Sequence, residues 1–176
     1  MSENVKSIVS LTLVCLFVSA AVVLTHKVTK PYIEKSANKA SYEAMETVLP
    51  DAKRFDEIKV SQEILTEYGC TFLRKTGDSK AIAIQIETRG YQSGLVVMIG
   101  IGADEKIKGV CVVQHAETEG IGTRAMTNEY LSIYNGKGNA ENVELLSGAT
   151  YTSQGIRNAV ENALGLFGKL KGELNK

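Results

Sequence analysis

The 176-residue chain has no excess of charge of either sign, because 20 Lys and Arg residues balance 20 Asp and Glu residues. It also has no basic block, so it lacks the electrostatic footprint that binding to a phosphate backbone requires, and we exclude nucleic acid as a partner. Charged residues make up 23% and hydrophobic residues 44% of the chain, which is not the composition of a disordered protein. The length suits one domain of ordinary size with a short appendage.

Other signatures are missing as well. The chain has no internal repeat, no Walker loop and no G-x-G-x-x-G after a predicted strand, so no motif supports the binding of a dinucleotide or a nucleoside triphosphate. The three cysteines do not have metal-ligand spacing. Cys15 falls in an apolar run, whereas Cys70 and Cys111 fit either one disulfide in an exported domain or two ordinary buried thiols.

A long apolar run lies near the N-terminus, where residues 7–25 carry no charge. At about 1.5 Å per residue, a helix of this length spans about 28 Å, close to the ~30 Å hydrocarbon core of a bilayer. A cleaved signal peptide and a buried core helix are the alternatives, but the run is long for a signal peptide and no small-residue cleavage site follows it cleanly. The sequence therefore predicts a single transmembrane helix in an N-terminal membrane anchor, residues 1–30 with the span at about 7–25, followed by one domain over residues 31–176.

The rest of the chain alternates between helical and strand periodicity. Helices are expected at about 34–49, 127–134 and 156–170, the first of them starting after Pro31 and ended by Pro50. Strands are expected at about 82–87, 95–101 and 107–113, with short glycine-containing connections that favour antiparallel pairing. Strands in one cluster with helices at the flanks indicate an α+β fold with an antiparallel sheet.

A hydroxyl-rich segment, Ser-Gly-Ala-Thr-Tyr-Thr-Ser at residues 147–153, precedes the last predicted helix. Small residues let the backbone approach a ligand closely, and a helix N-terminus offers amide hydrogens and a partial positive charge, so a phosphate suits this place. Simple capping of the helix by Thr152 or Ser153 is the alternative. A serine hydrolase has little support, because Leu145 stands where the G-x-S-x-G elbow around Ser147 needs its first glycine.

A second candidate segment, His-Ala-Glu-Thr-Glu-Gly-Ile-Gly at residues 115–122, directly follows a predicted strand. Gly120 and Gly122 allow a close approach of the backbone to a ligand, and Thr118 offers both a donor and an acceptor. The alternative is a glycine-rich turn with solvated acids. His115 is either a general base or a hydrogen-bonded structural residue.

Several blocks of the chain resemble the FMN-binding domain family. Ser147-Gly148-Ala149-Thr150 is similar to the family's S-G-A-T flavinylation motif. Residues 90–91, 96–101, 107–110 and 115–122 look like its G-Y, V-x-x-G-I, I-x-G-V and H-x-E-T-P-G-L-G blocks, in the same order. With the anchor included, the chain resembles the G subunit of Rnf electron-transport complexes and, more distantly, the C subunit of the sodium-pumping NADH:quinone oxidoreductase.

The resemblance implies a covalent FMN whose phosphate is esterified to the hydroxyl of Thr150. The single negative charge of that phosphodiester would lie at a helix N-terminus, where amides and the helix dipole stabilise it. The other cofactor-binding residues implied are Ser147, Gly148, Ala149, Thr152 and Ser153 around the phosphate, and Tyr91, Glu117, Thr118 and Gly120 beside the flavin.

The resemblance also implies a role and partners. The chain would be a membrane-anchored electron-transfer subunit of an ion-translocating ferredoxin:NAD oxidoreductase of the Rnf type, with the integral membrane and redox subunits as partners and no complete active site of its own. The sequence shows no base or metal site beside Thr150, which fits the family's use of a separate Mg-dependent flavin transferase with FAD as donor.

The expected location is the cell membrane, where the anchor contacts lipid and the domain lies on the extracytoplasmic side, as in the family. Lys27, Lys30 and Lys35 follow the span and would favour the cytoplasm by the positive-inside rule, but a long domain can translocate despite nearby charge.

The chain departs from the family pattern at two acidic residues. Glu119 replaces the proline of E-T-P-G, and Glu144 stands where the flavinylation motif usually has an aspartate. Two other functions stay open: a stand-alone exported flavoprotein reductase, and a non-redox anchored interaction module in which S-G-A-T only caps a helix.

Overall fold

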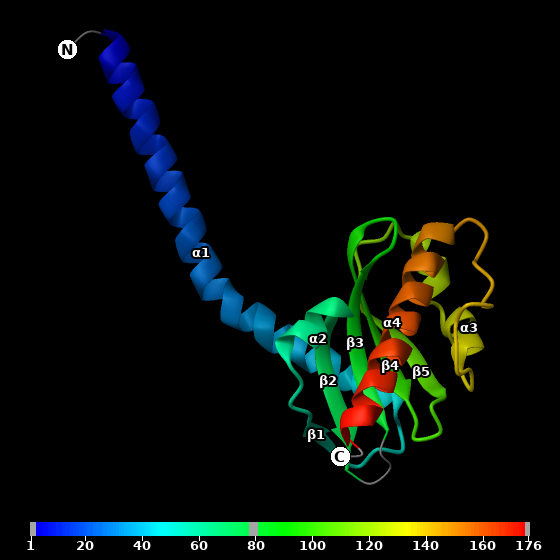
Figure 1. Ribbon diagram of the computed structural model, residues 1–176. Helices are drawn as coiled ribbons and strands as arrows, with labels where there is room; N and C mark the ends of the chain where they lie inside the picture. Colours follow the sequence, from blue (N-terminus) through cyan, green and yellow to red (C-terminus); the bar gives the residue numbers. More distant parts are fainter. Residues whose placement is uncertain (1–2, 78–80, 175–176) are drawn as a thin grey trace. The chain divides into compact units, whose positions relative to one another are not determined.

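The structure is a computed structural model that describes residues 3–77 and 81–174 (Figure 1). Its elements in chain order are α1 (Glu3–Val48), β1 (Phe55–Glu57), α2 (Gln62–Glu67), β2 (Cys70–Thr76), β3 (Ile82–Arg89), β4 (Ser93–Ile101), β5 (Ile107–Gln114), the 3-10 helix η1 (Gly122–Met126), α3 (Asn128–Leu131), the 3-10 helix η2 (Ser132–Tyr134) and α4 (Thr150–Leu174). The chain divides into two compact units, Met1–Lys39 and Ala40–Lys176, which are described separately.

The first unit is the N-terminal part of α1. Within it, Lys6–Lys30 is apolar enough to cross a membrane, with a mean hydropathy of 2.6, and none of this stretch is buried inside the structure. Most of its large apolar side chains are exposed, among them Leu11 and Phe17. A helix with such a surface is not a core helix of a folded domain.

Helix α1 runs through Pro31 without a break, so the expectation of a separate helix beginning near Glu34 is wrong. A proline in a helix interior removes one backbone hydrogen bond, at a cost of about 3 kcal/mol. Helical structure nevertheless continues on both sides of Pro31, over 46 residues in all. The expected end is confirmed, because α1 stops at Val48, two residues before Pro50.

The second unit is built on a five-stranded sheet in the order β1-β2-β3-β4-β5, in which all neighbours are antiparallel. The strands expected at 82–87, 95–101 and 107–113 are β3, β4 and β5, and the α+β prediction is confirmed. The sequence did not predict β1, α2 or β2. Strand β1 has only three residues, and β2 carries Arg74 and Lys75 between its apolar residues, which obscures the period of two.

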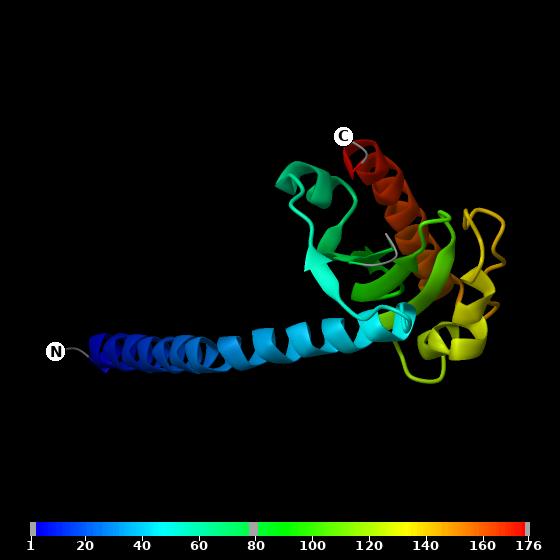
Figure 2. The same cartoon turned by 90° about the horizontal axis from the view of Figure 1, so that it is seen from below.

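Successive side chains of the central strands face two apolar cores, one on each side of the sheet. Ile82, Ile84 and Ile86 of β3 face a core that α4 covers, whereas Ala83 faces a smaller core on the other side of the sheet. Figure 2 shows α4 on one face of the sheet and the last turns of α1 on the other. The buried α4 residues follow a helical period: Ile156, Ala159, Val160, Ala163, Leu166, Phe167 and Leu170.

Two glycines let the end of α1 lie directly on the sheet. Gly100 of β4 pairs with Gly109 of β5. A Cβ added at Gly100 would lie 2.7 Å from the carbonyl oxygen of Val48, and one added at Gly109 would lie 2.9 Å from the Val48 Cα. The same helix is anchored by Ser41, whose hydroxyl donates to Gln85 Oε1 at 2.8 Å.

The sheet separates the two cysteines of the second unit. Cys70 belongs to the core on the α4 face, Cys111 packs against the core on the opposite face, and both are free. Of the two interpretations left open by the sequence, the structure therefore supports two separate thiols, of which Cys70 is buried and Cys111 half-buried.

We expect Gly100→Ala to destabilise the domain. The added methyl group has to displace the backbone at Val48, so the free energy of unfolding should fall by about 1–3 kcal/mol. Urea titration of the full chain in detergent measures this value. The control is Gly168→Ala in α4, where an added Cβ meets nothing within 4 Å, so that stability should rise by about 0.5–1 kcal/mol. Equal stability of the two variants would show that the approach of α1 to the sheet does not constrain the fold.

A second prediction concerns pH. Burial raises the pKa of the Cys70 thiol to about 11, from 9.0 for an ordinary thiol. The folded state therefore holds this proton more tightly than the unfolded chain does. The contribution of Cys70 to the free energy of unfolding should be constant below pH 9 and fall as the pH rises from 9 to about 11.

Urea titrations at pH 7.5 and pH 10 test this dependence. The wild-type chain should lose about 1 kcal/mol more than Cys70→Ala between the two values. Equal losses in both proteins would contradict the assignment of this pH dependence to Cys70.

Candidate functional site

Helix α4 begins at Thr150, directly after the turn of small residues 147–149. Gly148 has a φ of +81°, a left-handed conformation that favours glycine. The amide of Ala149 donates to the carbonyl oxygen of Leu146 at 2.9 Å, and the amide of Ser153 donates to that of Ala149 at 2.9 Å. The turn is thus closed on both sides, and it presents the Thr150 side chain at the surface.

The hydroxyl groups of this segment have different partners. Ser153 is fully buried, accepts a hydrogen bond from the Leu146 amide at 3.1 Å and donates to the Ala149 carbonyl at 3.0 Å. Thr152 is buried and donates to Glu117 Oε2 at 2.6 Å. The exposed Thr150 hydroxyl has no hydrogen-bond partner among residues 3–77 and 81–174. Neither Thr152 nor Ser153 caps the first turn of α4, in contrast to the simple capping alternative.

The Glu117 carboxylate joins three segments of the chain. Its side chain is only 6% exposed. Oε1 accepts a hydrogen bond from the Gln92 amide at 3.0 Å, and Oε2 accepts the one from Thr152. A Cβ added at Gly90 would lie 2.5 Å from Oε1, and one added at Gly122 would lie 2.7 Å from Oε2. The loop after β5, the connection between β3 and β4, and the start of α4 therefore meet at this carboxylate.

The turn after Glu117 is compact although Glu119 replaces the expected proline. The Thr118 carbonyl oxygen accepts hydrogen bonds from the amides of Ile121 at 3.2 Å and Gly122 at 3.0 Å. Gly120 has a φ of +74°, and its amide donates to the Thr123 hydroxyl at 2.9 Å. Glu119 itself is exposed. Backbone bonds thus provide the closure that a proline would favour.

These elements enclose a pocket of about 280 Å³ between the loop after β5 and the start of α4. The residues that line it are Tyr91, Glu117, Thr118, Ile121, Gly122, Gly148, Ala149, Thr150, Tyr151 and Thr152. Seven of the ten are among the cofactor-binding residues expected from the sequence. Four other candidates do not line it: Ser147, Gly120 and His115, which are exposed, and Ser153, which is buried behind the turn.

Two tyrosines form the exposed rim of the pocket. Tyr91 is 61% and Tyr151 70% exposed, and their ring centroids are 6.2 Å apart with the planes inclined by 58°. Sequence reasoning missed Tyr151, although an aromatic side chain next to Thr150 was the signal that could have found it. Ile121, which is 57% exposed, adds an apolar side chain to this rim.

Sequence reasoning also missed Arg124, on η1. A Cβ added at Gly148 would lie 3.1 Å from Arg124 Nη1, so the guanidinium lies beside the turn that leads into α4. The first turn of α4 contains no acidic residue. The positive end of this helix and a positive side chain are therefore close together, a combination that suits an anion.

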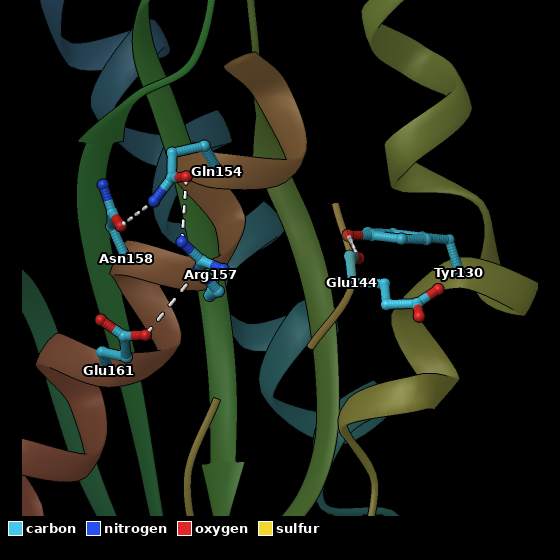
Figure 3. Close-up of polar contacts among 6 residues, drawn as sticks. All are labelled: Tyr130, Glu144, Gln154, Arg157, Asn158 and Glu161. Carbon is cyan, nitrogen blue, oxygen red and sulfur yellow. Dashed lines mark hydrogen bonds and ion pairs between the residues drawn. The ribbon is translucent and has the colours of Figure 1, made fainter. Parts of the chain in front are cut away.

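The segment that leads to Ser147 is fixed from α3. The Tyr130 hydroxyl donates to the carbonyl oxygen of Glu144 at 2.9 Å (Figure 3). The Tyr130 ring also packs edge-on against the buried ring of Tyr134, with 6.3 Å between centroids. Glu144, the second departure from the family pattern, thus has a fixed backbone and an exposed side chain.

In the described part of the chain, no group of three His, Cys, Asp or Glu side chains could hold a metal ion. Both oxygens of the one buried carboxylate in the pocket, Glu117, already accept hydrogen bonds. The pocket therefore presents hydroxyl groups, aromatic rings, one buried and hydrogen-bonded carboxylate, and a guanidinium close by.

Comparison with known proteins agrees with this geometry. Residues 90–165 match the family described as the FMN-binding domain. This range contains every residue that lines the pocket.

Three relatives cover most of the chain, and each is the G subunit of a multi-subunit complex. The G subunit of the proton-translocating ferredoxin:NAD(+) oxidoreductase complex of Clostridium ljungdahlii is 20% identical to this chain. The alignment covers 88% of this chain and 86% of that subunit. The G subunit of the ion-translocating oxidoreductase complex of Methanosarcina acetivorans is 25% identical, and the alignment covers 92% of this chain and 93% of that subunit. The G subunit of the Na(+)-translocating ferredoxin:NAD(+) oxidoreductase complex of Acetobacterium woodii is 25% identical, and the alignment covers 94% of each chain. Residues 90–165, the pocket-bearing part, therefore match the FMN-binding domain family, and over most of its length the chain is similar to the G subunits of ion-translocating oxidoreductase complexes.

Proposed function

We propose that this chain carries FMN covalently on Thr150 and passes electrons within a membrane-bound, ion-translocating ferredoxin:NAD oxidoreductase complex of the Rnf type. The names of its relatives support the type of complex. The observation that carries the attachment is the Thr150 hydroxyl, which is exposed and lines the pocket. The hydroxyls of Thr152 and Ser153 are instead held by other protein groups.

The residues of the pocket fit both ends of the cofactor. At the phosphate end, the small residues Gly148 and Ala149 line the pocket beside the first turn of α4, whose early amides do not all have helical partners, and Ser147 is exposed close by. At the ring end, Tyr91 and Tyr151 offer aromatic faces for stacking, and Thr118 and Gly120 belong to the bordering loop. When bound, the flavin supplies the electron-transfer chemistry, and the protein supplies position and electrostatics.

Attachment requires a second protein. The Thr150 oxygen bonds to the phosphorus of the FMN half of FAD, the pyrophosphate bond breaks, AMP leaves, and the hydroxyl proton is lost to a base. In the described part of the chain, no carboxylate or imidazole accepts a hydrogen bond from the Thr150 hydroxyl, and the Glu117 carboxylate is bonded instead to Thr152 and Gln92. A separate Mg-dependent flavin transferase therefore supplies the base and the metal.

The apolar part of α1 supports a place in the cell membrane. In this proposal residues 1–30 are the lipid-contacting anchor, crossing the membrane once, and residues 31–176 are the FMN-binding domain on the extracytoplasmic side. The partners are the integral membrane and redox subunits of the complex. A covalent cofactor suits this location, because a flavin lost outside the cytoplasm would not be replaced.

We expect Thr150→Ala to abolish attachment. The full chain is expressed together with an active flavin transferase, extracted in detergent and measured by intact mass and in-gel flavin fluorescence. The wild-type chain should carry one FMN-sized adduct and the variant none, because the bonding oxygen is gone. Thr66→Ala is the matched control, since Thr66 lies on α2 and its hydroxyl donates only to the Gln62 carbonyl.

Two outcomes would contradict the proposal. An unmodified wild-type chain would exclude a covalent carrier and return the segment to a purely structural role. An adduct that persists in Thr150→Ala would move the attachment point, with the exposed Ser147 as the next hydroxyl to replace.

The frame of the pocket makes a separate prediction. Thr152→Val keeps the shape of the side chain but removes the donor to the buried Glu117 carboxylate. The free energy of unfolding should fall by about 1–3 kcal/mol, because a buried acceptor loses its partner. Thr152→Ser keeps the hydroxyl and should lie close to wild type. Urea titration in detergent checks the order, and a valine variant as stable as the serine variant would show that this bond does not hold the site.

A further inference from the structure

We propose that Arg124 is the counter-ion of the phosphoryl group on Thr150 and positions that group while it is being attached. This inference rests on the proposed attachment at Thr150. It adds a residue that neither the sequence blocks nor the family match singles out, because Arg124 lies on η1, outside the S-G-A-T segment.

The backbone of Arg124 is held at a fixed place beside the pocket. Its amide donates to the Ile121 carbonyl at 3.3 Å, and its own carbonyl accepts from the Thr127 hydroxyl at 3.3 Å. The side chain extends from this turn to Gly148, two residues before Thr150, where Nη1 would lie 3.1 Å from an added Cβ. Glycine at 148 therefore leaves the space that the guanidinium occupies.

The charges around Arg124 point to an anion. A cation close to a helix N-terminus is repelled by the helix dipole unless a negative group lies between them. The first turn of α4 has no acidic residue, and in the described parts of the chain Arg124 makes no ion pair. Arg157, about two turns into α4, donates to Gln154 Oε1 at 3.0 Å and lies 3.9 Å from Glu161 (Figure 3). Of these two arginines near the start of α4, Arg124 is the one without a protein partner.

A phosphoryl group supplies the missing negative charge. The guanidinium is planar and presents paired N–H donors that match two oxygens of a phosphate. After attachment the phosphodiester has two non-bridging oxygens and one negative charge. During transfer from FAD, further charge develops on these oxygens, and a fixed cation stabilises it most at that moment.

The test compares attachment rates in the full chain. Wild type, Arg124→Gln, Arg124→Lys and Arg54→Gln are incubated in detergent with purified flavin transferase, FAD and Mg²⁺, and the adduct is followed by intact mass. Arg54→Gln is the matched control, because it removes the same charge from an exposed arginine that pairs with Asp56. We expect about a tenfold slower reaction for Arg124→Gln, partial rescue by Arg124→Lys, and the wild-type rate for Arg54→Gln.

A second readout separates contact with the phosphate from contact with the transferase. The ³¹P resonance of the attached phosphodiester should shift in Arg124→Gln relative to wild type and stay unchanged in Arg54→Gln. Urea titration of the unmodified chains should give equal midpoints, because Arg124 is exposed.

The outcomes are distinguishable. If wild type reacts, Thr150→Ala does not, and Arg124→Gln reacts at the wild-type rate, the inference about Arg124 is wrong and the attachment site stands. A slower rate with an unchanged ³¹P resonance would also overturn it, because Arg124 would then serve only the encounter with the transferase. If wild type does not react, the proposed attachment fails and the role of Arg124 fails with it.

Discussion

The candidate site depends on one buried carboxylate. Glu117 is almost fully enclosed, and a charge in such a place is costly unless hydrogen bonds satisfy it. Its two donors come from the connection between β3 and β4 and from the first turn of α4, segments 25 and 35 residues away in the chain. Because losing either donor would leave one buried oxygen without a hydrogen-bond partner, the three segments are held in one arrangement. Glycines at 90 and 122 give the carboxylate the space it needs.

This arrangement explains why neighbouring hydroxyls have different roles. Successive residues at the start of a helix point in directions about 100° apart, so Thr150, Thr152 and Ser153 face different surroundings. Thr152 faces Glu117, and Ser153 faces back into its own turn. Thr150 faces the pocket. The two structural hydroxyls fix the helix start, and the third can serve as an attachment point because the fold does not use it.

The elements that could be predicted from the sequence are those with a strong local pattern. The isoleucines of β3 alternate strictly, and this part of the sheet was predicted correctly. Strand β2 contains charged residues and the three-residue β1 is too short for a periodic signal, so both were missed. Most of the pocket residues could be named because they lie in contiguous blocks. Arg124 could not, since its relation to Gly148 exists only after η1 packs against the start of α4. The buried role of Ser153 depends in the same way on the fold of its turn.

The size and exposure of the pocket give a physical reason for the proposed covalent bond. The pocket has a volume of about 280 Å³, at the lower limit of the ~300–1,000 Å³ typical of sites that bury a small molecule. Three of its side chains are more than half exposed: Tyr91, Tyr151 and Ile121. A flat cofactor stacked on such a rim would keep much of its surface in contact with solvent, so burial alone would hold it weakly. The proposed bond to Thr150 would remove the need for burial. It would also leave the ring within reach of a redox partner that approaches from outside, which the proposed role as an electron carrier between subunits requires and a closed active site would prevent.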